Sequence, residues 1–360
     1  MKDQRLERVT LFARKFLQVP PNKVELLKGD GSDRQIFHIQ SSISLYNDMV
    51  GVIHENVYEN NDFIFLSDEF KKQGFPVPEI FRISKDRTMY LQQYLGLHNL
   101  AEKIDEWITS EQQSKIVDAY KRVIEFLVRF QQPLSNGLGD FLKNRQMDHH
   151  TYREDLGYFI RCFLLPFELN HLYTKELYDE LNTQILKKFS LLKTETFVYR
   201  DFQSRNVMWN GDSPWFIDYQ SAFKGPKYYD LASLLYSSKS GLDDILREQL
   251  LNYYYEISDE TVDYQEFEEM FYRFVILRRV RSLGSYGFLS LVKEKFDFFP
   301  RIGPTLEQIR ALIKKQSCLK PFTVLLDVVE EIIAIWEDKS EVFLIEHNRT
   351  KAKRTIIDTL

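Results

Sequence analysis

The sequence predicts an α+β protein with a small, β-rich N-terminal part and a larger, mostly helical C-terminal part. Short strand-like runs separated by turn residues dominate residues 24–95. Apolar residues at helical spacing recur from residue 115 onwards, interrupted by a strand–turn–strand pattern at residues 207–217. A run of strands followed by a run of helices is typical of the α+β class, in which the two kinds of element segregate.

The N-terminal part is predicted to begin with a helix and to continue as a small sheet. Residues 4–17 place apolar side chains at helical spacing, and Pro20-Pro21 ends that helix. Phe63–Phe70 shows a second apolar helical face. The strand candidates are Val24–Leu27, Ile36–Ile39, Met49–Ile53 and Met89–Leu95. We therefore expect a mostly β lobe over residues 1–96.

The remainder is predicted to be helical apart from the strand–turn–strand pattern. Residues 115–130 carry one apolar stripe. Further helices are expected in residues 152–190, 243–256, Leu277–Val292 and Val324–Trp336. We expect a helical lobe over residues 97–340 and a C-terminal tail over 341–360, whose basic residues are solvated.

The composition is that of a globular protein without a general affinity for polyanions. Of the 360 residues, 44% are hydrophobic and 14% aromatic, which is enough for a large core. The net charge of −5 gives no attraction to nucleic acid or to an anionic membrane. No signal core or membrane-spanning run is present in the sequence. Cys162 and Cys318 lack metal-ligand spacing and predict reduced thiols, so we expect a cytoplasmic protein.

The most informative stretch reads Tyr-Arg-Asp-x-x-x-x-Asn and then Asp-Tyr-Gln, with Asp201, Asn206 and Asp218 as its polar residues. A hairpin over residues 207–217 would return Asp218 to the side of Asn206. Carboxylate and amide oxygens suit magnesium, and Asp201 can take the proton of an acceptor hydroxyl. Asp and Asn in turns also cap backbone groups, but here three polar residues fall in register with two strands and a turn. The pattern favours a phosphoryl-transfer site.

Residues 197–236 resemble the aminoglycoside phosphotransferase and choline kinase superfamily. From Asp218 the chain reads Asp-Tyr-Gln-Ser-Ala-Phe-Lys-Gly-Pro-Lys-Tyr-Tyr-Asp-Leu-Ala-Ser-Leu-Leu. It is most similar to a bacterial branch that includes the anomeric kinases of N-acetylmuramate and N-acetylglucosamine, and weaker similarity covers residues 26–100 and 277–290. The resemblance implies a two-lobed protein-kinase-like fold with ATP and Mg²⁺ as cofactors.

The resemblance also implies a nucleotide site in the N-terminal lobe. Residues 29–34, Gly-Asp-Gly-Ser-Asp-Arg, are similar to the glycine loop whose backbone amides approach phosphates. Adenine would stack at the hinge around Tyr94 and bond to its backbone. The cofactor-binding residues expected on this basis are Gly29, Gly31, Ser32, Arg34, Gln93 and Leu95.

One departure from the kinase pattern concerns a lysine. Protein kinases hold the phosphates with a lysine on the third strand, paired with a glutamate on the next helix. The matching stretch here has no lysine, and His54 lies near its place and Glu59 near that of the glutamate. Either Arg34 or His54 supplies the missing charge, or ATP binding is weak and the protein is a pseudokinase. We favour the first, because the magnesium-binding set is complete and related sugar kinases also lack the lysine.

The resemblance assigns roles to the catalytic residues. Asp201 orients the acceptor hydroxyl and takes its proton, and Arg200 ties the catalytic loop to neighbouring carboxylates, Asp230 among them. Asn206 and Asp218 hold magnesium.

Three further residues of this region are expected to support the site. Asp230 has a structural role at the start of a helix. Gln220 replaces the usual glycine, which argues against the mobile Asp-Phe-Gly switch of protein kinases. Tyr199 replaces the usual histidine and is expected to keep an aromatic packing role.

The acceptor-binding residues are less sharply indicated. Lys224 could meet an anionic group or be a solvent-exposed charge. Arg278 and Arg281 share a helix face and could bind the acceptor or form ion pairs with acidic residues. The adjacent His149 and His150 have no recognisable third metal ligand and are expected at the surface.

The leading hypothesis is an ATP- and magnesium-dependent kinase acting on a hydroxyl of a small molecule, an amino sugar or related cell-wall sugar. The sugar preference comes from the resemblance alone. The alternatives are an aminoglycoside phosphotransferase and a catalytically idle nucleotide-binding protein. A protein-substrate kinase is disfavoured because the sequence has no recognisable activation segment ending in Ala-Pro-Glu.

Overall fold

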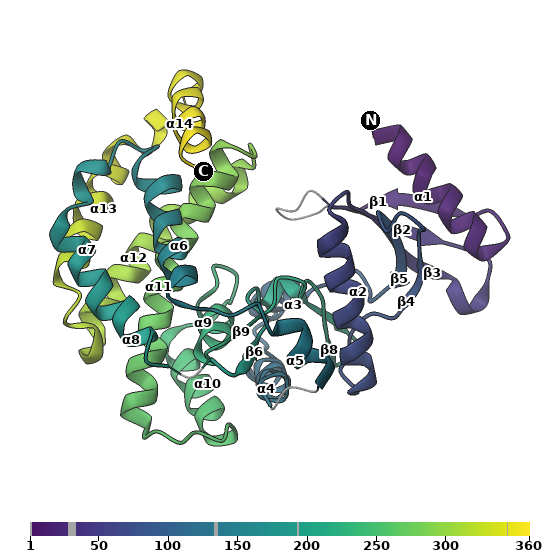
Figure 1. Cartoon of the computed structure of the whole chain (residues 1–360), viewed down its shortest axis with the longest axis horizontal. Coiled ribbons are helices and arrows are strands. Elements are labelled where there is room, and N and C mark those ends of the chain that lie inside the picture. The colour runs from purple at the N-terminus through teal and green to yellow at the C-terminus, as the bar shows by residue number, and fades with distance from the viewer. Residues whose placement is uncertain (1, 28–33, 133–135, 193, 344) are drawn as a thin grey trace. The chain divides into compact units, whose positions relative to one another are not determined.

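The computed structural model describes residues 2–27, 34–132, 136–192, 194–343 and 345–360. The chain packs as two compact units, whose elements are labelled in Figure 1. The first unit holds residues 1–129, 134–142 and 199–222, and the second holds residues 130–133, 143–198 and 223–360. The lobe boundaries expected from the sequence were drawn from the resemblance to kinases, whereas these two units are defined by packing. The expected boundaries therefore stay a prediction.

The first unit is built on a five-stranded antiparallel sheet with the order β1-β2-β3-β5-β4 (Figure 1). The four strand candidates named above are confirmed, and β4 lies at the edge of the sheet beside β5. The strands are β1 (Lys23–Leu26), β2 (Gln35–Gln40), β3 (Asp48–Ile53), β4 (Ile80–Ile83) and β5 (Met89–Gln93).

One face of this sheet is covered by the N-terminal helix α1 (Lys2–Leu17). Its buried stripe includes Val9, which packs with apolar side chains of β2, β3 and β5. Gly51 on β3 permits this close approach, because a Cβ atom there would lie 2.5 Å from Cγ2 of Val9. Successive side chains of a strand alternate between faces, so Val50 and Val52 point to the opposite face.

Helix α2 (Val57–Lys72) packs against that opposite face. Its Phe63 stacks on Tyr90 of β5 with ring centroids 5.5 Å apart. The side chain of Asn56 caps the helix by accepting from the amide of Glu59 at 3.3 Å. The cap therefore fixes Glu59 in the first turn. The unit also contains α3 (Leu100–Thr109), α4 (Gln113–Phe130), α5 (Asn136–Leu142), β7 (Val207–Asn210) and β8 (Ser213–Phe216).

The second unit is mostly helical, and its central element is the 28-residue helix α11 (Tyr264–Leu291). Every residue from Phe271 to Val280 is buried, so neighbours surround this helix on all sides. The other helices are α6 (His149–Phe159), α7 (Lys175–Leu181), α8 (Lys187–Phe189), α9 (Tyr228–Tyr236), α10 (Asp244–Ile257), α12 (Ile302–Lys315), α13 (Thr323–Phe343) and α14 (Glu346–Thr359).

Two glycines let α11 approach the α6 region closely. A Cβ atom on Gly287 would lie 1.9 Å from the carbonyl oxygen of Cys162, and one on Gly284 would lie 2.5 Å from that of Tyr158. Cys162 belongs to a π-helical turn, Ile160–Leu164, that continues α6. The helix contact therefore depends on the absence of side chains at these two positions.

The prediction that the 207–217 hairpin would be the only β structure in the C-terminal part was wrong. Strand β6 (Thr196–Val198) pairs antiparallel with β9 (Phe223–Gly225), and Val198 lies opposite Phe223. Strands of three residues are too short to show a period in the sequence. Within the residues that the structure describes, no helix is long and apolar enough to cross a membrane.

Candidate active site

The predicted hairpin is present and brings Asp218 beside Asn206. In the β7–β8 ladder, Val207 lies opposite Phe216 and Asn210 opposite Ser213, with Gly211 in the turn at a φ of 61°. The ladder continues one step further, because the amide of Ile217 donates to the carbonyl of Asn206 at 3.1 Å. Asp218 therefore follows directly after the residue that is bonded to Asn206.

The catalytic loop is closed by a hydrogen bond between two of its predicted site residues. The side-chain amide nitrogen of Asn206 donates to the carbonyl oxygen of Asp201 at 2.7 Å. Because the nitrogen is used in this way, Oδ1 is the atom with which Asn206 can bind a cation.

Two residues of this region have a strained backbone conformation. Arg200 has a φ of 77° and Asp218 a φ of 70°, in the left-handed region that residues other than glycine rarely adopt. Such conformations persist only where the surrounding structure holds them, and they cluster at functional sites.

The carboxylate of Asp218 is held by one of its oxygens. Oδ1 accepts from Nη1 of Arg34 at 2.9 Å and from Nε2 of Gln220 at 2.8 Å. The side chain is nevertheless 37% exposed. An oriented, accessible carboxylate next to the amide of Asn206 offers the hard oxygen donors that Mg²⁺ prefers, so these two residues would suit a magnesium ion.

Arg34 lies between Asp218 and helix α2. Its Nη2 atom is 3.0 Å from Oε2 of Glu59, and its side chain is only 8% exposed. Burial lowers the pKa of Arg34, but Tyr90, Asp218 and Glu59 outweigh it and raise the pKa above its ordinary value. The guanidinium is thus a permanent buried charge with two carboxylate partners.

Two tyrosines that the sequence analysis did not recognise as anchors hold the Asp218 segment in place. Tyr219 is fully buried, stacks on Phe63 of α2 with centroids 4.9 Å apart, and shares a 2.5 Å hydrogen bond with Ser67. Tyr199 donates its hydroxyl hydrogen to the carbonyl of Ile217. Tyr199 does pack among aromatic rings, but it also bonds to the backbone beside Asp218. In the sequence both tyrosines read as aromatic core residues, and nothing near them indicates the partners of their buried hydroxyl groups.

The predicted hinge follows β5. Tyr94 stacks on His38 of β2 with centroids 4.2 Å apart, and Leu95 is buried. The amide of Gln93 donates to the carbonyl of Glu79 at 2.8 Å. The remaining predicted nucleotide contacts, Gly29, Gly31 and Ser32, lie outside the residues that the structure describes.

The predicted acceptor residues of the second unit lie in a buried hydrogen-bond network. Arg278 donates from Nη1 to the hydroxyl of Tyr229 at 2.6 Å, and that hydroxyl donates to Asp155 at 3.4 Å. Nε of Arg281 donates to the other oxygen of Asp155 at 2.6 Å. These contacts connect α11, α9 and α6. Arg281 forms the ion pair that the sequence offered as an alternative, whereas Arg278 bonds to the hydroxyl of Tyr229. Their role in acceptor binding stays a prediction.

The other predicted residues of this unit lie in β9 and α9. Lys224 is half-buried in β9, where its backbone bonds to Arg145 and Met147. Asp230 is fully buried within the first turn of α9, which begins at Tyr228 rather than at Asp230 itself. The proposed tie between Arg200 and Asp230 stays a prediction.

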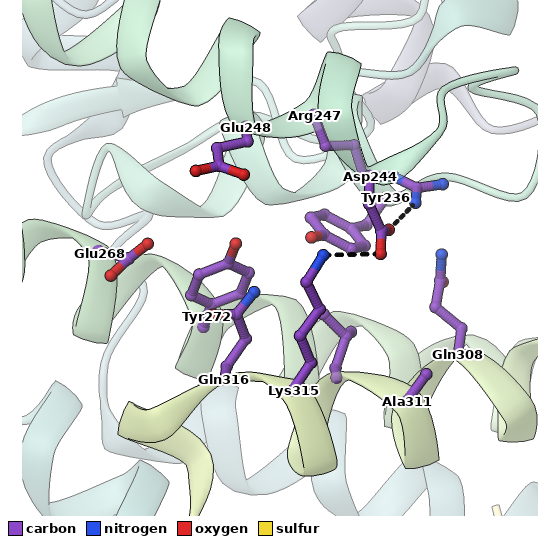
Figure 2. A pocket seen from close by; sticks show the side chains of 11 residues that line it. Tyr236, Asp244, Arg247, Glu248, Glu268, Tyr272, Gln308, Ala311, Lys315 and Gln316 are labelled. Carbon is purple, nitrogen blue, oxygen red and sulfur yellow. Dashed lines mark hydrogen bonds and ion pairs between the residues drawn. The ribbon is translucent and has the colours of Figure 1, made fainter.

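The second unit also contains a polar cavity of about 220 Å³ among α9, α10, α11 and α12. Figure 2 shows Lys315 and Arg247 both bonded to Asp244, at 2.9 and 3.0 Å, while Glu248 and Glu268 lie apart from this group. His149 and His150 are exposed at the start of α6. Among the residues described, no group of three or more His, Cys, Asp or Glu side chains could hold a metal ion.

The comparisons with known proteins identify the family. The profile of the phosphotransferase enzyme family (APH) matches residues 60–269, which is more than half of the chain and includes α2 and the whole catalytic hairpin. The chain belongs to this phosphotransferase family, and the resemblance noted in the sequence is confirmed at that level. Its small antiparallel sheet and larger helical unit also confirm the predicted kinase-like fold class.

The individual similarities are more distant. An N-acetylmuramate/N-acetylglucosamine kinase of Neisseria meningitidis serogroup B is 26% identical over 141 residues, covering 38% of this chain and 42% of the relative. The chain thus matches about two fifths of that protein. The streptomycin–ATP ternary complex of APH(2″)-IIa superposes with a TM-score of 0.57 at 14% identity, covering 81% of this chain and 95% of that one. A choline/ethanolamine kinase family protein from Mesorhizobium loti gives a TM-score of 0.57 at 14% identity over 90% and 99%.

Proposed function

We propose that this protein is an ATP- and Mg²⁺-dependent kinase that transfers the γ-phosphoryl group to a hydroxyl group of a small molecule. The observation that carries the proposal is the hydrogen-bonded arrangement of Asp201, Asn206 and Asp218 on one hairpin and its loop. Membership of the phosphotransferase family supports the reaction type.

Asn206 and Asp218 would hold the metal through Oδ atoms. Bound there, Mg²⁺ supplies positive charge to the β- and γ-phosphate oxygens. Gln220 and Arg34 fix the orientation of the Asp218 carboxylate by donating to Oδ1. Little reorganisation is then needed when nucleotide binds. This suits phosphoryl transfer, because its loose transition state leaves the protein mainly to position the reactants and to stabilise charge.

Asp201 acts on the acceptor. Its carboxylate accepts a hydrogen bond from the attacking hydroxyl, orients the hydroxyl oxygen towards the γ-phosphorus, and takes the proton as the new P–O bond forms and the bond to ADP breaks. The hydrogen bond from Asn206 to the Asp201 carbonyl keeps the base and a metal ligand in one rigid loop.

We infer that the acceptor is an amino sugar or related cell-wall sugar. The sequence similarity to an N-acetylmuramate/N-acetylglucosamine kinase supports this class. A second candidate is an aminoglycoside, because a solved structure with a similar fold, APH(2″)-IIa, holds streptomycin and ATP. The two candidates share the reaction and differ in the acceptor cleft.

The test is transfer of label from γ-labelled ATP in the presence of magnesium. The acceptors would be N-acetylmuramate, N-acetylglucosamine, other hexoses and hexosamines, choline and several aminoglycosides. Asp201→Asn serves as the blank. Labelled sugar made by the wild type and absent from the blank supports the proposal, and labelled aminoglycoside alone supports the second candidate. Tight Mg-ATP binding without any labelled product contradicts both and favours an idle nucleotide-binding protein.

A further inference from the structure

Other side chains lie where protein kinases have the third-strand lysine. The β2–β3 ladder pairs Gln35 with Ile53, so Arg34 and His54 are the next facing positions at the ends of their strands. Side-chain alternation puts both on the face of the sheet that packs against α2. An arginine and a histidine side chain therefore approach the first turn of α2, one from each strand.

Arg34 and His54 face the same carboxylate oxygen at different distances. Oε2 of Glu59 is 3.0 Å from Nη2 of Arg34 but 4.0 Å from Nδ1 of His54, which is beyond hydrogen-bond range. The other oxygen of Glu59 accepts from the side-chain amide of Asn56 at 3.1 Å. Glu59 is thus oriented by Asn56 on one side and by Arg34 on the other.

The guanidinium of Arg34 has a second arm, and this arm reaches the metal-binding carboxylate. Nη1 lies 2.9 Å from Asp218, so one planar fork joins helix α2 to the hairpin. A lysine ammonium is a compact point charge, whereas the arginine fork presents several donors at fixed angles. The permanent positive charge lies next to the position where magnesium-bound phosphates would be held.

We propose that Arg34, which directly precedes β2, replaces the missing third-strand lysine: it couples α2 to Asp218 and contacts the nucleotide phosphates. This inference rests on the proposed nucleotide-binding function. Arg34 is a positioning residue for Asp218 and a binding residue for ATP. This role of Arg34 explains why the chain can lack a lysine on β3 and still retain Glu59 on α2.

The structure suggests a relocation experiment. His54 and Glu59 border a cavity of about 320 Å³, which leaves room for a longer side chain at position 54. The variants are Arg34→Met, Arg34→Lys and the double variant Arg34→Met/His54→Lys. Arg82→Met is the matched control, because Arg82 is exposed on β4 of the same sheet. Glu59 and Asp218 are 44% and 37% exposed, so water can solvate them when the guanidinium is removed, and the variants should fold.

The measurements are the Kd of Mg-ATP by calorimetry, the KM for ATP and the melting temperature. Loss of a charged hydrogen-bond donor in Arg34→Met should weaken Mg-ATP binding about 10–100-fold. The lysine at position 54 in the double variant should recover about tenfold of this loss, without a matching rise in melting temperature. The control should bind as the wild type does.

Wild-type affinity in Arg34→Met would overturn the inference. So would a loss of affinity that neither Arg34→Lys nor the double variant recovers, since that result assigns Arg34 a purely structural role. Wild-type protein that binds Mg-ATP but phosphorylates no acceptor contradicts the proposed kinase function, and the binding data still decide the role of Arg34. Wild-type protein that does not bind Mg-ATP overturns both proposals.

Discussion

The hydroxyl of Tyr199 donates a hydrogen bond to the carbonyl oxygen of Ile217, the residue immediately before Asp218. Tyr199 itself precedes Arg200 and Asp201. One buried contact therefore joins the strand end that leads into the loop of Asp201 to the strand end that leads into Asp218.

Tyr199→Phe should weaken this connection while keeping the aromatic packing. The carbonyl of Ile217 loses its donor, so we expect a loss of about 1–3 kcal/mol in the free energy of unfolding, measured by urea denaturation. Catalytic efficiency should fall as well, because the position of Asp218 becomes less well defined. Tyr58→Phe is the control, since Tyr58 is 83% exposed. Equal stability of the two variants would show that the hydrogen bond contributes nothing.

Asp201→Asn should reduce turnover by about 10²–10⁴-fold, the usual contribution of a general base. The Kd for Mg-ATP should stay at the wild-type value, because the nucleotide and metal contacts are retained. The measurement is steady-state phosphorylation together with calorimetry. Asp212→Asn in the exposed turn of the same hairpin is the control. Undiminished turnover in Asp201→Asn would remove this residue from the reaction.

Asp218→Ala should impair magnesium-dependent nucleotide binding and not only turnover. The variant loses a charged ligand, whereas Asn206→Ala loses a neutral one. Removal of a residue that only hydrogen-bonds to a metal ligand typically lowers metal affinity about 10–100-fold. We expect the magnesium concentration for half-maximal ATP binding to rise by at least this factor in Asp218→Ala. The shift should be smaller in Asn206→Ala. A magnesium titration that leaves Asp218→Ala unchanged contradicts the metal assignment.

Gly287→Ala tests the close contact between α11 and the π-helical turn after α6. The added methyl group would lie 1.9 Å from the Cys162 carbonyl oxygen, so the helices must separate. Overpacking of this kind costs about 1–3 kcal/mol, which urea denaturation can resolve. Gly139→Ala in α5 is a matched helical control, because a Cβ atom there meets nothing within 4 Å. The control should be neutral or slightly stabilised, since alanine favours helix more than glycine does.

Glu268→Gln should change how stability depends on pH. Burial, and then the nearby carboxylate of Glu248, raise the pKa of Glu268 above its ordinary value of 4.5. For a group with a raised pKa, the stabilising contribution is complete below the unfolded pKa and is lost as the pH rises through the folded pKa.

The glutamine variant should therefore melt at a higher temperature than the wild type near neutral pH, and this advantage should disappear as the pH falls towards the ordinary value. Melting curves over this range provide the measurement, with Glu111→Gln at the surface as control. An advantage that is independent of pH would assign the effect to packing instead of charge.

The parts of the site that the sequence predicted are local in the chain. The hairpin and the placement of Asp218 beside Asn206 depend on strand pairing across one tight turn, and turn residues mark such pairing in a sequence. The fold class was also predictable, because strand-rich and helix-rich stretches are separate along the chain.

The parts that the sequence did not reveal depend on distant residues. Arg34 meets Asp218 across 184 positions of the chain, and Ser67 meets Tyr219 across 152. No periodicity or spacing encodes such contacts. The sequence offered Arg34 or His54 as the source of the missing charge and placed Arg34 among the nucleotide-binding residues. The geometry around Glu59 supports Arg34, which lies 3.0 Å from the carboxylate, whereas His54 lies 4.0 Å from it.

The ladder between β6 and β9 gives the segment from Tyr199 to Ala222 a pair of fixed ends. Val198 and Phe223 face each other, so the segment that carries Asp201, Asn206 and Asp218 leaves and rejoins the ladder at a single rung. A segment closed at its base tolerates changes of length near its tip at little entropic cost. It is therefore a natural unit for recombination. A chimera that exchanges it for the same segment of another family member must preserve the rung at its base and the contacts of Asp218 with Arg34 and of Tyr219 with Ser67. The chemistry of the exchanged segment can then be examined separately from acceptor preference.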